Sequence, residues 1–375
     1  MKDSCQYIGM LSGTSRDGVD AVLVEFGDHQ PRLHESICLP YPPELAFLLK
    51  AMIEAGQRPA KQELEKVDGL LATFFSHTVQ ALLTKAGIEA SSVVAIGSHG
   101  QTVWHDPNGA HPETLQLGNP QVIAQNTGMT TVGDFRSRDV RAGGQGAPLA
   151  PLLHRALFQP EKGRRVVLNL GGIANISVVS SDGTVMGFDT GPANCLLDAW
   201  IQDQLGKSYD RAGAWSGGGA VNKLLLLDLM MDPYFKKSPP KSTGVEYFNL
   251  KWLQSREMVN AIDPRDVQAT LAQFTASTVA SSVGSCNPAD VLVCGGGAHN
   301  KDLLTRLKNL LPECTVESTA SHGLDPDSIE AVLFAWLARE RIAGRSQDTG
   351  SITGAREPVL LGEIYKSAPF PNPCS

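Results

Sequence analysis

Residues 7–26 read YIGMLSGTSRDGVDAVLVEF, and this stretch decides how the chain begins to fold. Its apolar runs, residues 7–11 and 21–26, have the composition of short strands, and residues 12–18 between them have the composition of a turn. The pattern predicts a β-hairpin with a polar tip.

A second hairpin pattern opens the second half of the chain. Residues 165–179 read RVVLNLGGIANISVV, in which a glycine pair separates two strand-like runs. Elsewhere, strand-like runs alternate with helical spacing of apolar residues, as in the helix expected from Val67 to a stop at Gly87. We therefore expect an α/β protein with an internal duplication, divided into lobes of residues 1–160 and 161–375.

The composition narrows the class of protein. The 375 residues are 42% hydrophobic and 19% charged, which suits two folded lobes and not a disordered chain. Lys and Arg number 32 against 39 Asp and Glu, so the net charge of −7 provides no basic field for a nucleic acid. Seven cysteines, odd in number and never spaced as CxxC, fit a reducing compartment and predict no thiol metal site. Because the sequence has no signal peptide and no membrane-spanning run, we expect a soluble, cytoplasmic protein.

The tip of the first hairpin is a candidate binding loop. Small residues in 12–20 let backbone N–H groups approach an anion, and hydroxyl groups add donors, so the loop suits phosphate. Its carboxylates, Asp17 and Asp20, suit Mg²⁺ that is held through water molecules. The sequence contains no P-loop motif and no GxGxxG turn after a strand, so this would be a different kind of phosphate loop. An ordinary polar hairpin tip explains the same residues.

A glycine triplet, Gly295 to Gly297, follows the strand-like residues 290–294. Because glycine has no Cβ atom, a flat ring can lie directly against such a backbone. Together with a phosphate hairpin in each half, the triplet is a candidate adenosine site. A tight turn between a strand and a helix is the alternative.

Asp189 stands after a strand expected at residues 185–188, where residues 189–192 are expected to open a helix. At that position a carboxylate can point into a cleft and act as a general base. Asp189 or Thr190 can equally cap the helix. The sequence leaves both interpretations open.

Residues 98–105 read SHGQTVWH and combine two histidines, an amide, a hydroxyl and an indole. This mixture is typical of sugar recognition, because hydroxyl groups need paired donors and acceptors and sugar rings stack on aromatic ones. A zinc site lacks an evident third ligand. The charged residues 134–139 form either a solvated surface or a clamp for a substrate carboxylate.

Eight segments, in this order along nearly the whole chain, resemble the anhydro-N-acetylmuramic acid kinase family: residues 13–20, 98–105, 132–136, 143–148, 169–175, 189–192, 240–244 and 294–297. The resemblance implies two related lobes of the actin-like ATPase (ribonuclease H-like) fold around a central cleft. It implies an ATP-dependent, Mg²⁺-assisted kinase that opens 1,6-anhydro-N-acetylmuramic acid with water and phosphorylates its 6-oxygen. The product is N-acetylmuramic acid 6-phosphate, in bacterial cell-wall recycling. A homodimer is also implied.

The resemblance assigns a role to particular residues. Asp189 activates the water. The expected cofactor-binding residues are Gly13, Thr14, Ser15, Arg16, Asp17, Gly18, Val19, Asp20, Gly171, Gly172, Gly295, Gly296 and Gly297. The expected substrate-binding residues are Gln101, Thr102, Arg136 and Glu330, with Arg136 a partner for the lactyl carboxylate. Glu330 also suits a first-turn helix position that interacts with the macrodipole. No protein side chain is expected to bind a metal ion directly.

Two departures from the family pattern bear on the site. Arg16 replaces an apolar residue beside the phosphate loop, and Ala193 replaces a glycine close to Asp189. Two other functions fit the same residues. One is another sugar or acyl-group kinase, in which Asp189 deprotonates a substrate hydroxyl. The other is an ATP- or sugar-responsive binding protein that has lost turnover.

Overall fold

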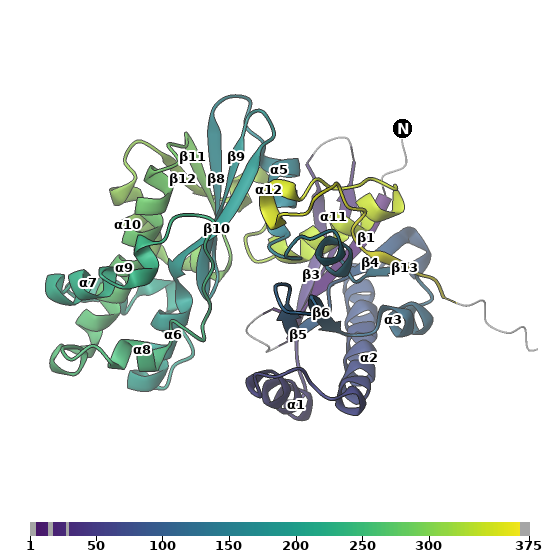
Figure 1. The fold of residues 1–375 in the computed structure, drawn as a ribbon, viewed down its shortest axis with the longest axis horizontal. Coiled ribbons are helices and arrows are strands. Elements are labelled where there is room, and N and C mark those ends of the chain that lie inside the picture. Colours follow the sequence, from purple (N-terminus) through teal and green to yellow (C-terminus); the bar gives the residue numbers. More distant parts are fainter. Residues whose placement is uncertain (1–4, 14–17, 28–29, 368–375) are drawn as a thin grey trace, which may run out of the picture. The chain divides into compact units, whose positions relative to one another are not determined.

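A computed structural model of the chain describes residues 5–13, 18–27 and 30–367 (Figure 1). The chain forms two compact units. The first contains Met1–Leu153 and Ser328–Ser375, and the second contains His154–Asp327. Each unit is built on one large sheet.

The sheet of the first unit has six strands in the order β13-β7-β4-β1-β2-β3. The strands are β1 Cys5–Leu11, β2 Gly18–Phe26, β3 Arg32–Pro40, β4 Val93–Ser98, β7 Thr131–Gly133 and β13 Glu363–Tyr365. β1, β2 and β3 form an antiparallel meander, while β4 pairs in parallel with β1 and with β7. The predicted hairpin of residues 7–26 is thereby confirmed. A separate two-stranded sheet joins β5 Gln101–Asp106 to β6 Glu113–Leu117.

The sheet of the second unit has five strands in the order β10-β9-β8-β11-β12, which corresponds to β3-β2-β1-β4-β7 of the first unit; the sixth strand there, β13, is additional. Its strands are β8 Arg164–Leu170, β9 Ile173–Ser180, β10 Val185–Pro192, β11 Asp290–Cys294 and β12 Thr315–Ser318. Again the first three strands form an antiparallel meander, and the other two run parallel to the first. The repeated order and directions confirm the internal duplication and the α/β class of two related ribonuclease H-like lobes. The cleft between them stays a prediction.

Twelve α-helices accompany the sheets in the part of the chain that the structure describes. They are α1 Pro43–Glu54, α2 Lys61–Ala86, α3 Pro120–Thr127, α4 Ser137–Arg141, α5 Ala150–Phe158, α6 Asn194–Leu205, α7 Lys223–Met230, α8 Leu250–Gln254, α9 Pro264–Gly284, α10 Lys301–Leu310, α11 Ile329–Ile342 and α12 Gly350–Thr353. α2 ends at Gly87 in the left-handed conformation (φ 67°), as its sequence predicts. None of the described helices combines the length and apolar character that a membrane crossing requires.

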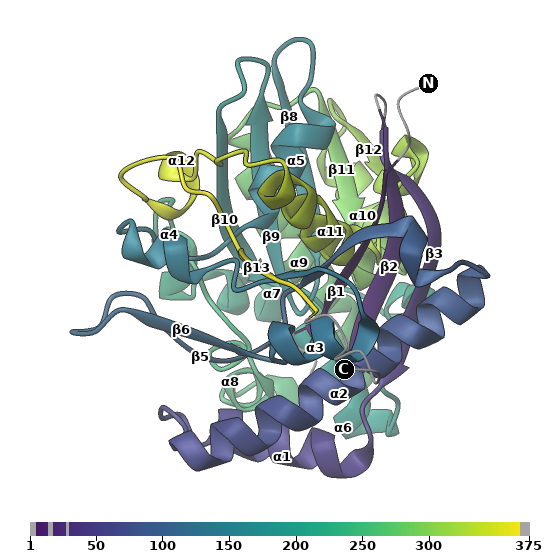
Figure 2. The ribbon, with the colours of Figure 1, turned by 90° about the vertical axis from the view of Figure 1, so that its right-hand side faces the viewer.

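Helices α2 and α11 cover the sheet of the first unit (Figure 2). Ile8 and Met10 of β1 belong to the same buried cluster as Phe75 of α2. Side chains alternate along a strand, so Gly9 between them faces the other side. There a Cβ atom would collide with the backbone of α11, and the same is true of Gly97 on β4. These glycines let α11 lie directly against the sheet.

The structure divides the chain differently from the expected lobes 1–160 and 161–375. The first boundary falls inside α5, close to the expected position, but residues 328–375 belong to the first unit. α11 packs on β1 and β4, and β13 adds an antiparallel strand beside β7. Packing on a sheet this distant in the sequence leaves no local signal, so the sequence did not reveal the return of the chain.

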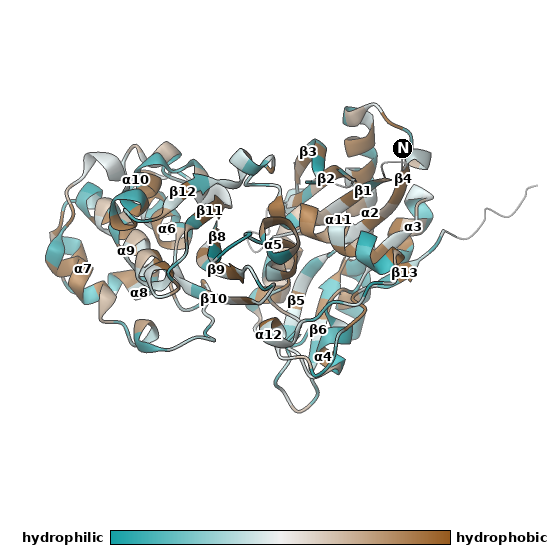
Figure 3. Cartoon of the chain, turned by 90° about the horizontal axis from the view of Figure 1, so that it is seen from above, coloured by the Kyte–Doolittle hydropathy of each residue, from teal (hydrophilic) through white to brown (hydrophobic). Residues whose placement is uncertain are grey.

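Two helix predictions also change. Residues 189–192 do not open a helix, because β10 continues to pair with β9 as far as Pro192 and α6 begins only at Asn194. The apolar residues between Ile329 and Leu337 predict a helix with one apolar face, but this helix, α11, is buried on almost every side from Ile329 to Ala338, because it is the central cover of its sheet. Figure 3 colours the residues by hydropathy, with hydrophobic residues in brown.

Candidate active site

The substrate candidate Arg136 lies in the first unit, at the residue before α4. Its Nε–H donates to Nε2 of His99 at 2.8 Å, and its Nη1 donates to the carbonyl of Gly146 at 2.8 Å. Burial lowers the pKa of Arg136 to about 10, against the opposing effects of Glu330 and Asp139. The guanidinium is therefore fixed in direction while it stays cationic at neutral pH.

Gln101 and Thr102 begin β5, directly after the turn that leaves β4. Gln101 is buried, and its Oε1 accepts a hydrogen bond from the Ser12 hydroxyl at 2.5 Å. The hydroxyl oxygen of Thr102 accepts one from Gln116 at 3.3 Å. The contact from Ser12 joins the expected sugar-binding segment to the first residue of the expected phosphate-binding loop.

The charged run at 134–139 separates into different roles. Arg138 forms a bidentate ion pair with Glu363 of β13 at 2.7 Å. Asp139 is fully buried and accepts hydrogen bonds from the Gly146 N–H and the Thr349 and Thr353 hydroxyls, at 2.6–2.8 Å. These two residues hold the fold together locally. Arg136 remains as the member of the run that suits a substrate carboxylate.

Glu330 is exposed in the first turn of α11, the macrodipole position that its sequence suggests. It also acts electrostatically on Arg136. The four substrate candidates, Gln101, Thr102, Arg136 and Glu330, thus all belong to the first unit.

The hairpin that is expected to bind phosphate is described in part. The structure does not describe four of its expected cofactor-binding residues, Thr14, Ser15, Arg16 and Asp17, and their role stays a prediction. Gly13 precedes that gap, and β2 resumes at Gly18 with the buried Val19 and the part-buried Asp20. At Gly18 a Cβ atom would collide with the Leu39 carbonyl of β3, so this glycine is required for strand packing.

Asp189 lies in β10 of the second unit and does not cap α6. The residue before α6 is Ala193, and no side chain forms a capping hydrogen bond there. The Thr190 hydroxyl donates instead to the Ala174 carbonyl at 3.2 Å. The pairing of β10 with β9 shifts register between Asp189 and Gly191. The capping interpretation of Asp189 and Thr190 is therefore wrong.

The Asp189 side chain is anchored by a segment far along the chain. Its Oδ2 accepts a hydrogen bond from the Thr243 backbone N–H at 3.0 Å, and its own N–H donates to the Lys241 carbonyl at 3.1 Å. The Tyr234 hydroxyl donates to the Asp189 carbonyl at 2.7 Å. Sequence reasoning singled out residues 240–244 as a motif but assigned them no contact, and it missed Tyr234 entirely.

Burial raises the pKa of Asp189 to about 6; the Thr243 N–H opposes this rise and Glu246 adds to it. The carboxyl group is thus still largely ionised at neutral pH, but it binds a proton far more readily than an exposed aspartate. A carboxylate with these properties is suited to proton abstraction.

Ala193, the residue that departs from the family pattern, lies directly before α6. Its φ is −120°, outside the left-handed region that favours glycine. Ala193 donates its N–H to the Gly172 carbonyl at 2.9 Å, and Asn194 donates to the Gly171 carbonyl at 3.0 Å. The glycine pair that separates β8 from β9 is therefore tied to the beginning of α6.

The three glycines of the triplet differ in their surroundings. At Gly295 (φ 77°) a Cβ atom would collide with Asn169, and at Gly297 it would lie 2.5 Å from the Leu170 Cβ. At Gly296 no atom lies within 4 Å of that position. Gly295 and Gly297 thus serve the tight turn, and Gly296 is the one that can lie against a ligand.

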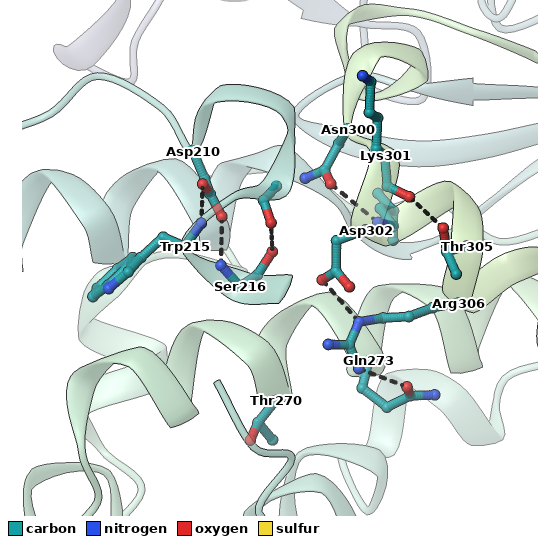
Figure 4. A network of polar contacts seen from close by, with 12 residues as sticks. Asp210, Trp215, Ser216, Thr270, Gln273, Asn300, Lys301, Asp302, Thr305 and Arg306 are labelled. Atoms are coloured by element: carbon teal, nitrogen blue, oxygen red, sulfur yellow. Dashed lines mark hydrogen bonds and ion pairs between the residues drawn. The ribbon is translucent and has the colours of Figure 1, made fainter. Parts of the chain in front are cut away.

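A second glycine-containing segment, which sequence reasoning did not assign, lies next to this triplet. Gly213 approaches the Asn300 side chain so closely that a Cβ atom would collide with it. Both carboxylate oxygens of Asp210 accept backbone N–H bonds at 2.8 Å, from Trp215 and Ser216 (Figure 4). Asn300 in turn caps α10 by accepting the Leu303 N–H at 3.0 Å. This network fixes the backbone that follows the triplet.

Within the described ranges, no three histidine, cysteine, aspartate or glutamate side chains gather so that they could hold a metal ion. Asp17 lies outside those ranges.

Comparisons with known proteins give one consistent family. A family model described as "Anhydro-N-acetylmuramic acid kinase" matches residues 5–367. A protein of that name from Xanthomonas campestris pv. campestris is 46% identical over 364 residues, which cover 96% of this chain and 97% of the relative. One from Xanthomonas axonopodis pv. citri is 47% identical over 369 residues, 97% of this chain and 98% of the relative.

Solved structures are similar only distantly. The activator of the 2-hydroxyisocaproyl-CoA dehydratase from Clostridium difficile aligns with a TM-score of 0.47 and 11% identity, over 90% of this chain and 96% of that one. A glucokinase of the ROK family from Streptomyces griseus aligns with a TM-score of 0.40 and 14% identity, over 89% and 99%.

Proposed function

The chain belongs to the anhydro-N-acetylmuramic acid kinase family, and from this membership we propose that Asp189 is the general base of its reaction. The enzyme is an ATP-dependent phosphotransferase that acts on 1,6-anhydro-N-acetylmuramic acid in bacterial cell-wall recycling. Water adds to the anomeric carbon, the bond from that carbon to the 6-oxygen breaks, and the 6-oxygen takes the γ-phosphoryl group. The products are N-acetylmuramic acid 6-phosphate and ADP.

The observation that carries the proposal is the anchoring of Asp189. Thr243 holds one carboxylate oxygen through its N–H, which fixes the direction of the group and leaves Oδ1 to accept a proton from water. The pKa of about 6 supports the same role, because the group is ionised before reaction and basic enough to accept the proton.

The ATP side of the proposal uses three glycine-rich segments. The hairpin loop Gly13 to Asp20 and the pair Gly171–Gly172 would hold the phosphates through backbone N–H groups. Gly296 would lie against the nucleoside, and the open space beside it supports this placement. Gly295 and Gly297 would shape the same turn without touching the ligand.

Mg²⁺ is part of the proposal, held mainly by the phosphates and by water. Asp20, part-buried at the start of β2, and Asp17 would accept hydrogen bonds from the water molecules that this ion keeps. When bound, the ion offsets phosphate charge during transfer.

The substrate side is proposed to lie on the first unit. Arg136 would bind the lactyl carboxylate, since its guanidinium is fixed and cationic. Gln101 and Thr102 would contact the sugar through their amide and hydroxyl groups, and Glu330 would accept from a sugar hydroxyl.

Two further expectations, the oligomeric state and the cellular location, are proposals of their own. We propose a homodimer, which light scattering coupled to gel filtration tests directly. We also propose a cytoplasmic location, supported by the odd number and scattered spacing of the seven cysteines. Cell fractionation tests this location.

The experiment for the general base compares two neutralised carboxylates. Asp189→Asn keeps an oxygen to accept the Thr243 N–H but cannot take a proton, so we expect binding of an ATP analogue without product formation. Asp198→Asn is the matched control, because burial also raises the pKa of Asp198, to about 7, and it is assigned no role in the site. Turnover near the wild-type rate in Asp189→Asn would place the base elsewhere.

A further inference from the structure

His99 is held on several sides at the end of β4. It is only 7% exposed, and its backbone N–H donates to the Met10 carbonyl at 3.0 Å. The centroid of its ring lies 4.5 Å from that of Phe334. Phe334 belongs to α11, the helix that carries Glu330 in its first turn. The imidazole therefore has a fixed position between the sheet and its covering helix.

The hydrogen bonds of His99 allow only one protonation state. Arginine has no acceptor, so the 2.8 Å contact with Arg136 Nε requires an unprotonated Nε2 on the histidine. Nδ1 lies 3.1 Å from the Gly100 carbonyl, which accepts only, so Nδ1 carries the proton. His99 is thus neutral, in agreement with burial and the nearby Arg136, which hold its pKa well below the usual value.

This neutral acceptor determines which edge of the guanidinium is used by the protein. Nε is bound to His99 and Nη1 to the Gly146 carbonyl, so within the described part of the chain these two anchors leave Nη2 without a hydrogen-bond partner. Both of these acceptors are uncharged. Two charged groups, Glu330 and Asp139, act on Arg136 through their electrostatic effect on its pKa. Asp139 is already bonded to Gly146, Thr349 and Thr353.

We propose that His99 is a positioning residue, which orients Arg136 so that its Nη2 edge receives the carboxylate of the substrate. His99 thereby determines the preference for a carboxylate-bearing anhydro sugar over one without a carboxylate. The inference rests on the proposed contact between Arg136 and the lactyl group. A neutral imidazole orients the guanidinium without cancelling its charge, which a carboxylate in the same place would do.

The test compares the binding of two sugars by calorimetry. The sugars are 1,6-anhydro-N-acetylmuramic acid and 1,6-anhydro-N-acetylglucosamine, which lacks the lactyl group. His99→Leu removes the acceptor, and we expect about tenfold weaker binding of the carboxylate-bearing sugar. Binding of the lactyl-free sugar should stay within about twofold, by the same arithmetic.

His99→Gln, which restores an acceptor, should recover part of the loss. An equal loss for both sugars would show a merely structural role and would overturn the proposal.

Two controls separate this inference from the proposed function. His154→Gln replaces another buried histidine, in the second unit and bonded to Ser177, and should alter neither affinity. Arg136→Leu should abolish the preference for the carboxylate-bearing sugar. If it does not, the contact between Arg136 and the lactyl group is wrong. If it does, and His99→Leu leaves the preference intact, only the role of His99 is wrong.

A measurement on the unaltered protein covers the case in which His99→Leu fails to fold. In ¹⁵N NMR spectra, His99 should remain neutral with its proton on Nδ1 down to pH 5, because it must accept from Arg136. A proton on Nε2, or a cationic ring at neutral pH, would contradict the proposal directly.

Discussion

Thr243 donates its backbone N–H to Oδ2 of Asp189 across 54 residues of sequence, at 3.0 Å. The Lys241 carbonyl accepts the Asp189 N–H at 3.1 Å, so the same short segment holds both the backbone and the side chain of the proposed base. The geometry therefore distinguishes the two carboxylate oxygens. Oδ2 is used for orientation, and Oδ1 is the oxygen that we assign to proton transfer.

Asp189→Asn is expected to stabilise the protein while it abolishes turnover. The folded state raises the Asp189 pKa from 3.8 to about 6, so it favours the neutral form. Neutralising the group removes an unfavourable contribution of at most about 3 kcal/mol at pH 7. Chemical denaturation at pH 7 and at pH 4 measures this effect.

The size of this effect depends on pH. The raised pKa means that the wild type gains stability as pH falls through about 6 toward 4, because the folded state binds the proton more tightly. The gap between Asp189→Asn and the wild type should therefore close at pH 4. A variant less stable than the wild type at pH 7 would contradict the burial of a charged Asp189.

The pH dependence of kcat/KM is expected to show an acid limb near pH 6. Activity should rise as the pH increases through this value, because the base must be ionised. Glu246→Gln should move the limb to lower pH, since the Glu246 charge contributes to the raised pKa. Glu257→Gln removes an exposed carboxylate that is not a cause of the shift, and it should leave the limb in place. A limb that does not respond to Glu246→Gln would assign it to a different group.

Tyr234→Phe is expected to lower kcat severalfold without changing the affinity for ATP. The variant loses the 2.7 Å hydrogen bond to the Asp189 carbonyl, a bond of about 1 kcal/mol, but keeps its ring packing. Tyr247→Phe is the matched control in the same aromatic cluster, because its hydroxyl donates to Asp232 at 3.0 Å and not to Asp189. Steady-state kinetics of both variants measures the difference, and equal losses would show a general packing effect.

The glycine triplet is expected to divide into structural and ligand-contacting positions. Gly296→Ala should fold normally, since no atom lies within 4 Å of the added Cβ, but should weaken binding of an ATP analogue. Gly295→Ala should instead lower the melting temperature, because the added Cβ would collide with Asn169 at a positive φ. Thermal denaturation and calorimetry separate the two effects. Unchanged nucleotide affinity in Gly296→Ala would remove Gly296 from the binding site.

The sequence predicted those parts of the fold that depend on local pattern. The β1–β2 hairpin follows from two apolar runs around a polar turn, and Gly87 ends α2 because it accepts the left-handed conformation. The return of residues 328–375 to the first sheet was not predictable, because Gly9 and Gly97 give no sign of the helix that packs on them. Such long-range packing depends on shape complementarity between distant segments.

The candidate site shows the same limit. The sequence identified Asp189 by its position after a strand, but it could not choose between a base and a cap. The choice depends on the extension of β10 to Pro192 and on hydrogen bonds from residues 45 and 54 positions away. Likewise, the motif around Gly295 was visible, whereas the difference between Gly296 and its neighbours depends on Asn169 and Leu170 of another strand.

The central claim, that this enzyme couples the opening of an anhydro sugar by water to phosphoryl transfer, is tested most directly by mass spectrometry of its products. The protein is incubated with Mg-ATP and 1,6-anhydro-N-acetylmuramic acid in ¹⁸O-labelled water. We predict a ring-opened 6-phosphate that carries one solvent oxygen, at the anomeric carbon, and ADP in equal amount. A phosphorylated product without solvent oxygen, or ADP formation without a phosphorylated sugar, would contradict the account.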